Sequence, residues 1–373
     1  MCFSSTSGQN NCSTQAHKWC TLKAWEWRDN NGWIVGCNYI PATAINQLEM
    51  WQEETFDLAC IDKELSWAED LGFNTIRVFL HHLLWEQDPV GFISRIHQFL
   101  SVADKHNIKT MFVLFDAVWD PYPKLGKQPE PKLNIHNSGW VQSPGYDILK
   151  NIDAYDSLRS YVEGVVGSFK NDHRVLIWDL FNEPDNTNTA SYNDADYGVD
   201  KAELALKLLK KTFEWVRALE PIQPLTAAPW KDDWSDEALI SELDNFMFSN
   251  SDIISFHCYE DKEKFEERLQ HMQRFNRPLL CTEYMARHLE STFYDILPLL
   301  KKYNVGAFNW GFVAGKTQTH CAWESWQSAD NKEPEMWFHD IFRENGEPFD
   351  KAEVEFIQNM LKQKAIETYQ KVA

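Results

Sequence analysis

The sequence predicts an α/β fold, and within that class a (β/α)8 TIM barrel formed by a single domain. Short apolar runs rich in β-branched and aromatic residues alternate with longer amphipathic segments, and eight of each can be counted along the 373 residues. This alternation is typical of parallel strands joined by helices. A dinucleotide-binding open sheet would carry a glycine-rich turn after its first strand. The chain has Gly36-Cys37-Asn38-Tyr39 there, which favours the closed barrel.

The eight apolar runs are the predicted strands. Most are apolar almost throughout, as strands buried on both faces are. They lie at 34–38, 75–80, 110–116, 175–181, 224–229, 253–259, 278–284 and 305–310.

The amphipathic segments between these runs are the predicted helices, and several follow an Asp, Ser or Asn that can cap a helix. They lie at 55–70, 90–106, 153–170, 198–219, 235–247, 261–275, 290–303 and 350–368.

The domain organisation follows from the same pattern. Residues 1–20 are predicted to be a polar N-terminal extension and residues 21–373 the barrel, since no linker or repeat divides the chain. The longest loops, 117–152, 185–199 and 311–333, all follow strands. They therefore lie on the face where barrel enzymes carry their sites, which predicts that function resides there.

Composition limits the possible partners. The formal net charge of -20 argues against nucleic acid or an anionic membrane surface as a partner, because both would repel the chain. No apolar stretch is long enough for a membrane span. The 17 Trp residues suit the faces of sugar rings, although a Trp-rich core would explain many of them. A neutral carbohydrate is the expected partner, and the oligomeric state is left open.

The eight cysteines do not indicate a metal site, since no C-x-x-C pair or Cys/His zinc spacing occurs. Cys37, Cys258 and Cys281 lie within predicted strands, where they are expected to pack as small apolar residues. Cys12 and Cys20 could form a local bridge in an oxidising compartment.

The first residues bear on localisation. No secretory signal is present in the first thirty residues, although a leader could have been removed. Cys2 followed by the Ser/Thr/Gly-rich residues 3–8 would suit the start of a processed lipoprotein. The location is left open between a secreted, periplasmic or lipid-anchored protein whose leader is absent from this chain and a protein with a disordered cytoplasmic N-terminus.

Two carboxyl groups are predicted at the same rim of the barrel. The fourth strand ends in Asn182-Glu183-Pro184, and the seventh contains Glu283 near its end. Glycosidic cleavage needs such a pair, one group to protonate the leaving oxygen and one to attack or stabilise the anomeric carbon. Alternatively, the tripeptide is a strand end before a proline turn, and Glu283 belongs to an ordinary ion pair.

With these residues, the sequence resembles the clan A glycoside hydrolases, in particular the cellulase-like family 5. The resemblance spans the second to the eighth strand and rests on Arg77, Asn182-Glu183-Pro184, His257, Tyr259, Glu283 and Trp310. It implies a retaining glycoside hydrolase that cleaves a β-glycosidic bond in a neutral oligo- or polysaccharide without metal or cofactor. Glu183 would then be the acid/base and Glu283 the nucleophile.

The resemblance also implies roles for the residues around the nucleophile. Arg77 would keep Glu283 ionised by its fixed positive charge, and Tyr259 would donate to the same carboxylate. Considered alone, Arg77 could equally be a barrel-core arginine paired with a carboxylate.

Three further residues are implied to contact the substrate. Asn182 would hydrogen-bond the sugar 2-hydroxyl, a contact that strengthens in the transition state. His257 would orient the substrate or the acid/base, or else be a hydrogen-bonded core histidine. Trp310 would form the floor under the sugar in the cleaved subsite.

One position departs from the family pattern. The resemblance implies a histidine near the end of the third strand, where this chain has Phe115-Asp116-Ala117. Asp116 would bind a sugar hydroxyl or close a structural ion pair.

Other rim residues are candidates for substrate contacts. Trp119 and Trp230 follow the third and fifth strands, so each is a candidate stacking platform, as are Trp85 and Trp140 unless they pack within loops. Lys316 follows the eighth strand and could reach a hydroxyl or an acidic substituent, or be a solvated loop lysine.

Three alternative functions remain at this point. A transglycosylase would use the same barrel and the same glutamates but a sugar acceptor in place of water. A non-catalytic carbohydrate-binding barrel would have no need of a proton donor and a nucleophile. A metal-dependent barrel hydrolase is disfavoured because no His-x-His pair ends the first strand. The sugar and the linkage stay open, and the long loops slightly favour a short cleft with exo action.

Overall fold

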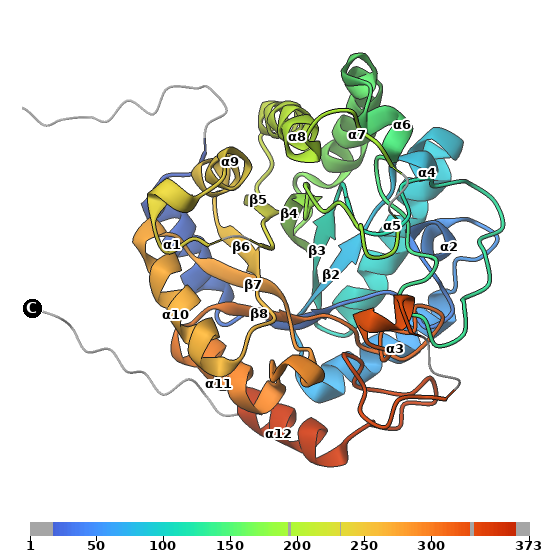
Figure 1. Cartoon of the computed structure of the whole chain (residues 1–373), viewed down its shortest axis with the longest axis vertical. Helices are drawn as coiled ribbons and strands as arrows, with labels where there is room; N and C mark the ends of the chain where they lie inside the picture. The colour runs from blue at the N-terminus through green and yellow to red at the C-terminus, as the bar shows by residue number, and fades with distance from the viewer. Residues whose placement is uncertain (1–17, 193–194, 232, 329–331, 363–373) are drawn as a thin grey trace, which may run out of the picture.

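The computed structural model of the chain describes residues 18–192, 195–231, 233–328 and 332–362. Eight parallel strands form a ring at its centre, and helices surround the ring (Figure 1). The strands are β1 Val35–Asn38, β2 Thr75–Phe79, β3 Lys109–Val113, β4 Val175–Asn182, β5 Leu225–Ala228, β6 Ile254–His257, β7 Leu279–Tyr284 and β8 Gly306–Asn309. Each predicted run overlaps one of these strands, so the predicted (β/α)8 barrel is confirmed.

The ring closes at two places. The first strand pairs with both β2 and β8, and the sheet order is β5-β4-β3-β2-β1-β8-β7-β6. Individual hydrogen bonds close the remaining seam between β5 and β6. The Asp252 N–H donates to the Leu225 carbonyl at 2.8 Å, and the His257 N–H donates to the Pro229 carbonyl at 3.0 Å.

Each of the eight predicted helical segments overlaps a helix. The helices are α1 Thr21–Asn31, α2 Gln47–Trp51, α3 Leu58–Leu71, α4 His82–Gln87, α5 Pro89–Lys105, α6 Tyr146–Leu149, α7 Arg159–Phe169, α8 Lys201–Ala218, α9 Glu242–Asn250, α10 Lys262–Met272, α11 Phe293–Lys302 and α12 Lys351–Lys362. Side chains at the N-caps accept backbone N–H bonds as predicted, for example Asp57 before α3 and Asp261 before α10. Residues 363–368 of the last predicted helix lie outside the described residues.

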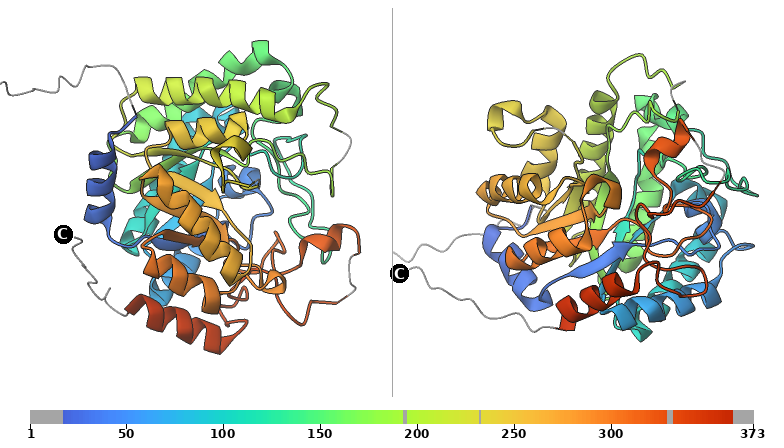
Figure 2. Two further views of the ribbon diagram at one scale, coloured as in Figure 1. Left: turned by 60° about the vertical axis from the view of Figure 1, so that its left-hand side comes forward. Right: turned by 60° about the horizontal axis from the view of Figure 1, so that its bottom comes forward.

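Helix α1 was not predicted, and it covers the amino-terminal end of the barrel. Ala24 is fully buried in an apolar cluster with strand residues that include Met111 and Phe308, and Trp27 packs against the cluster. Just before the helix, the Trp19 N–H donates to Asp252 at 2.7 Å. Figure 2 shows α1 at one end of the barrel and the long loops at the other.

The three cysteines predicted to pack as small apolar residues do so: two lie in strands, and Cys258 directly follows β6. Cys37, Cys258 and Cys281 are buried and unpaired. Cys2 and Cys12 lie outside the described residues. Over the part of the chain that the structure describes, every helix is too short or too polar to cross a membrane.

Candidate active site

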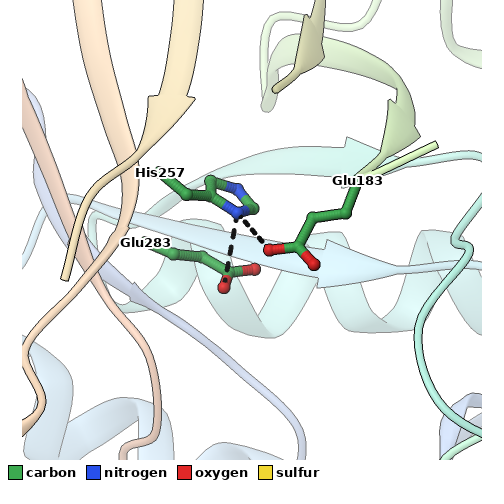
Figure 3. Close-up of side chains that lie close together, drawn as sticks. All are labelled: Glu183, His257 and Glu283. Atoms are coloured by element: carbon green, nitrogen blue, oxygen red, sulfur yellow. Dashed lines mark hydrogen bonds and ion pairs between the residues drawn. The ribbon is translucent and has the colours of Figure 1, made fainter. Parts of the chain in front are cut away.

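The two predicted glutamates face one another across the mouth of the barrel, with a histidine between them (Figure 3). Glu183 follows β4 directly, Glu283 lies in β7, and His257 ends β6. The His257 Nδ1 atom lies 2.7 Å from Glu183 Oε1 and 3.5 Å from Glu283 Oε2. An oxygen of each carboxyl group and a ring nitrogen all lie within 4.8 Å of one another. The barrel therefore brings both carboxyl groups to one small space.

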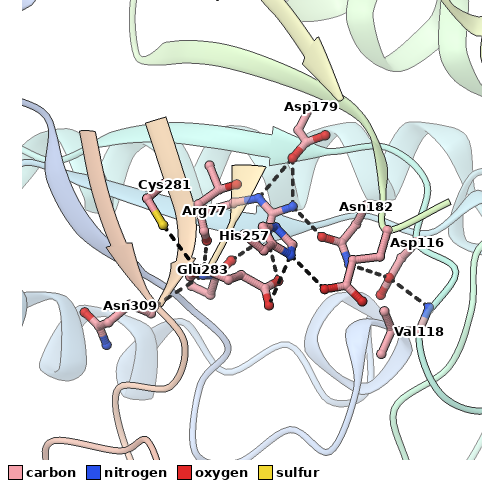
Figure 4. A network of polar contacts seen from close by, with 12 residues as sticks. Arg77, Asp116, Val118, Asp179, Asn182, His257, Cys281, Glu283 and Asn309 are labelled. Carbon is pink, nitrogen blue, oxygen red and sulfur yellow. Dashed lines mark hydrogen bonds and ion pairs between the residues drawn. The ribbon is translucent and has the colours of Figure 1, made fainter. Parts of the chain in front are cut away.

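Glu283 accepts hydrogen bonds from two side chains. Arg77 Nη1 donates to Oε1 at 3.2 Å, and the Tyr259 hydroxyl donates to Oε2 at 2.8 Å. Arg77 is fully buried and is held by Asp179, which accepts from its Nη2 at 2.7 Å (Figure 4). A rigid cation and a hydroxyl donor therefore stabilise negative charge on Glu283.

Glu183 has a different environment. Its Oε2 accepts from Asn186 Nδ2 at 2.7 Å, and its Oε1 contacts the ring of His257. Its backbone has a φ of 42°, in the left-handed region that non-glycine residues seldom adopt. The neighbouring Asp185 and the burial of the side chain both disfavour a charged Glu183.

Burial raises the pKa of both carboxyl groups to about 7. Arg77 and Tyr259 favour the charged form of Glu283, in opposition to burial. Negative charge on one carboxyl group disfavours ionisation of the other, so the pair titrates together. Burial also lowers the pKa of His257 to about 4, so its ring is neutral at neutral pH.

Asn182 and Asp116 form a network beside the glutamates. The Asn182 Oδ1 atom accepts from Arg77 at 2.6 Å, and its Nδ2 donates to Asp116 at 2.9 Å. The other carboxylate oxygen of Asp116 accepts from Trp140 at 2.6 Å and Gln47 at 3.1 Å. These bonds fix which end of the Asn182 amide carries its donors. Asp116 thus orients Asn182 through hydrogen bonds.

A cavity of about 320 Å³ opens above these groups. Its lining includes most of the predicted site residues: Glu183, Glu283, Asn182, His257, Tyr259, Trp310, Asp116, Trp119 and Trp230. Two predicted residues do not line it. Arg77 lies buried behind Glu283, and Lys316 donates to Glu49 at 2.6 Å away from the cavity.

The four rim tryptophans divide into two groups. Trp119 and Trp230 line the cavity, and Trp230 donates to Asp185 at 2.9 Å. Trp140 is buried, and Trp85 packs against Gly164. Neither of these last two lines the cavity: Trp140 packs edge-on against Phe79 and Trp310, and Trp85 packs between helices α4 and α7.

Several cavity residues were not predicted because they come from loops. Asn186, Asn137 and Trp323 line the cavity, together with residues 187–191. Lys201 acts behind this lining: its buried ammonium donates to the carbonyls of Asn186 and Ala117. Lys201 thereby ties the loop after β4 to the loop after β3. Its position at the start of an amphipathic helix carries no sequence signal for that role.

The Glu183, His257 and Glu283 side chains also offer three ligand atoms of the kind that bind metal ions. Among the described residues, no other cluster of His, Cys, Asp or Glu side chains offers three such ligand atoms. However, Arg77 lies 3.2 Å from Glu283 and supplies positive charge to the same carboxylate. A divalent cation at this position would be repelled by that guanidinium.

Comparison with known proteins adds a family match. A family model described as cellulase (glycosyl hydrolase family 5) matches residues 41–329. The chain is 24% identical over 259 residues to a mannan endo-1,4-beta-mannosidase of Arabidopsis thaliana, a match that covers 64% of this chain and 54% of that protein. The chain thus spans about half the length of the curated relative it matches.

Solved structures share the barrel. A beta-mannanase from the blue mussel Mytilus edulis superimposes with a TM-score of 0.55 and 14% identity over 79% of this chain and 89% of that chain. An exo-beta-1,4-mannosidase from Opitutaceae bacterium strain TAV5 superimposes with a TM-score of 0.60 and 15% identity over 88% of this chain and 59% of that chain. At these identities the likeness establishes the common fold.

Proposed function

Because this chain belongs to glycosyl hydrolase family 5, we propose that it cleaves a β-glycosidic bond with retention, using Glu283 as nucleophile and Glu183 as acid/base. The main observation that supports this proposal is that oxygens of the two carboxyl groups lie within 4.8 Å of one another. Retaining glycosidases hold these groups about 5–5.5 Å apart, whereas inverting enzymes leave about 6.5–9.5 Å for a water molecule. The separation therefore supports direct attack by a carboxylate.

The proposed reaction has two steps. In the first, a Glu283 oxygen bonds to the anomeric carbon while Glu183 gives its proton to the departing glycosidic oxygen. In the second, Glu183 removes a proton from water, the water oxygen bonds to the anomeric carbon, and the bond to Glu283 breaks. No cofactor is needed. Arg77 and Tyr259 support this assignment because both donate to Glu283.

The proposed substrate is a β-1,4-linked mannoside. The comparisons support it, since the curated relative and both solved structures are named for action on mannan or mannosides. Trp310 would supply the apolar floor under the sugar: it lines the cavity and is braced edge-on by Trp140 at 5.7 Å and Phe79 at 5.8 Å.

Variants at the two glutamates test this function. Glu283→Ala should lower kcat on aryl β-mannosides by at least about 10⁴-fold, since nothing else can form the covalent intermediate. Added azide should restore turnover and yield the glycosyl azide with inverted configuration. Glu183→Ala should slow substrates with poor leaving groups far more than activated aryl mannosides, since only the former need protonation.

The controls separate this proposal from its alternatives. Glu260→Gln changes a surface carboxylate paired with Arg268 and should leave kcat unchanged. Incubation with EDTA should also leave activity unchanged, because the proposed reaction uses no metal ion. If the wild type cleaved none of a panel of aryl glycosides but still bound sugar, the non-catalytic carbohydrate-binding barrel would be favoured. Oligosaccharides longer than the substrate would favour transglycosylation.

A further inference from the structure

Three aromatic side chains from different loops meet beside the cavity. Trp119 follows β3, Tyr192 follows β4, and Trp326 ends a short 3-10 helix, Trp323–Trp326, that follows β8. The Trp119 and Trp326 rings stack at 5.9 Å with an interplanar angle of 16°. The Tyr192 ring meets Trp326 edge-on at 5.2 Å. We call these three residues the aromatic bridge.

Hydrogen bonds fasten the aromatic bridge to the backbone of the loops. Trp326 Nε1 donates to the His136 carbonyl at 2.8 Å, in the loop after β3. The next residue, Gln327, donates from its side chain to the Ala190 carbonyl at 2.9 Å, in the loop after β4. The loop after β8 is therefore anchored to both other loops, and opening the bridge would break stacking and hydrogen bonds together.

The position of the bridge determines which side of the cavity it closes. In the ring of strands, β1 and β2 lie between β8 and β3. The loop after β1 contacts both other loops, since the Lys316 N–H donates to the Ala42 carbonyl at 3.0 Å and the Asn46 side chain donates to the Gly139 carbonyl at 2.8 Å. Trp119 of the bridge lines the cavity together with His136, whose carbonyl accepts from Trp326, so the bridge supports the cavity wall on this side. Trp230 and Tyr259, which follow β5 and β6, line the opposite side.

Asn137 adds a polar group to the closed side. Its side chain is fully buried and lines the cavity, yet neither amide atom has a hydrogen-bond partner among the described residues. Its backbone N–H donates to the Thr317 carbonyl at 2.7 Å, which holds it in place. Buried amides normally have partners. A sugar hydroxyl can both accept from the Asn137 amide and donate to it.

We propose that the aromatic bridge closes the cavity beyond the sugar that lies on Trp310, so that the enzyme removes single residues from the non-reducing end of a chain. This rests on the proposed function, in which Glu283 attacks the anomeric carbon of that sugar. Trp310 packs on Phe79 of β2, so the sugar lies toward the walled side. The leaving chain exits past Trp230, and Asn137 binds a hydroxyl of the terminal residue.

The size of the cavity agrees with this mode. Its volume of about 320 Å³ is at the lower end of the ~300–1,000 Å³ range of small-molecule pockets. An enzyme that cuts within a polymer needs a groove open at both ends. Here the wall occupies the place where further residues of the chain would have to lie.

Product analysis with an end-labelled oligosaccharide tests the proposal. β-1,4-mannohexaose carrying a fluorescent label at its reducing end should yield free mannose and labelled pentaose as the first products, followed by labelled tetraose. Early labelled biose or triose would show internal cleavage, and early labelled mannose would show attack from the reducing end. Either result overturns the proposal.

Opening the wall gives a second test. The double variant Trp326→Ala, Gln327→Ala should release labelled biose and triose from the start, while Asn137→Ala should raise KM for the hexaose roughly tenfold by loss of a buried hydrogen bond. Trp25→Ala on α1 is the control, because its indole bonds Asn276 far from the cavity. A folded double variant, checked by circular dichroism, that still releases only mannose would refute the wall.

Failure of this inference and failure of the proposed function give different results. Cleavage of aryl mannosides that depends on Glu283 supports the function whatever the product pattern. If another aryl glycoside is the one cleaved, the end-labelled hexaose of that sugar replaces mannohexaose. Cleavage of the hexaose by Glu283→Gln at the wild-type rate would contradict the proposed function.

Discussion

The charge on Glu283 is set by two side chains that form no bond with the substrate in the proposed reaction. Arg77 is buried and pinned by Asp179, so its positive charge cannot move away. Tyr259 donates to the other carboxylate oxygen. Both favour the ionised form, in opposition to burial, which raises the pKa of Glu283 to about 7. The acidic limb of the pH profile should therefore report this balance.

Tyr259→Phe is expected to move that limb to higher pH. Loss of the hydroxyl removes a donor that stabilises only the ionised carboxylate, so the pKa of Glu283 rises. A hydrogen bond to a charged group contributes about 1.5–3 kcal/mol, and one pH unit corresponds to ~1.4 kcal/mol. The limb should shift upward by roughly one unit or more. The measurement is kcat/KM against pH on an aryl mannoside.

The matched control is Tyr303→Phe, which removes a hydroxyl that donates to surface Glu266 at 2.7 Å. Its profile should coincide with that of the wild type. A Tyr259→Phe profile that loses rate equally at every pH would instead indicate that Tyr259 only positions the substrate, and the electrostatic account of Glu283 would be wrong.

At the scale of elements, strands were easier to predict than loops. All eight strands could be located because strands buried on both faces are apolar throughout. Glu183, His257 and Glu283 could be located with them, because strand ends in a barrel share one rim. Asn137 and Trp323 could not, since each reaches the cavity through a long loop whose path depends on contacts between distant segments.

Helix α1 was missed for a related reason. Ala24 is its one buried residue, so the helix lacks the wide apolar stripe that reveals an amphipathic helix. It is nevertheless packed closely against the amino-terminal ends of the strands, where Ala24 has no exposed surface. A small residue is required at that point of contact.

Ala24→Leu should therefore destabilise the protein by about 1–3 kcal/mol, the usual cost of inserting methylenes into a packed core. Leu22→Ala on the same helix is the control, because Leu22 is 68% exposed and should change stability little. Urea unfolding curves measure both. The kcat of folded Ala24→Leu should match that of the wild type, since α1 and the glutamates lie at opposite ends of the barrel. A stable Ala24→Leu would show that α1 packs loosely.

At the scale of the whole molecule, closure of the ring links the two ends of the chain. Strand β1 pairs with β2 on one side and with β8 on the other, so residues 35–37 share hydrogen bonds with residues 307–309. The seam at β5 and β6 is closed by its own bonds. Unfolding any one strand would expose the edges of its two neighbours and leave their backbone N–H and C=O groups unpaired.

The single-domain prediction then has a calorimetric consequence. Residues 21–362 should unfold in one transition, with equal calorimetric and van't Hoff enthalpies, because each strand depends on two neighbours around the ring. The Ala24→Leu change at the amino-terminal end of the barrel should lower the temperature of the entire transition, and a saturating sugar ligand at the other end should raise it. If Ala24→Leu instead split off an early transition that the ligand does not affect, α1 would form a unit separate from the barrel.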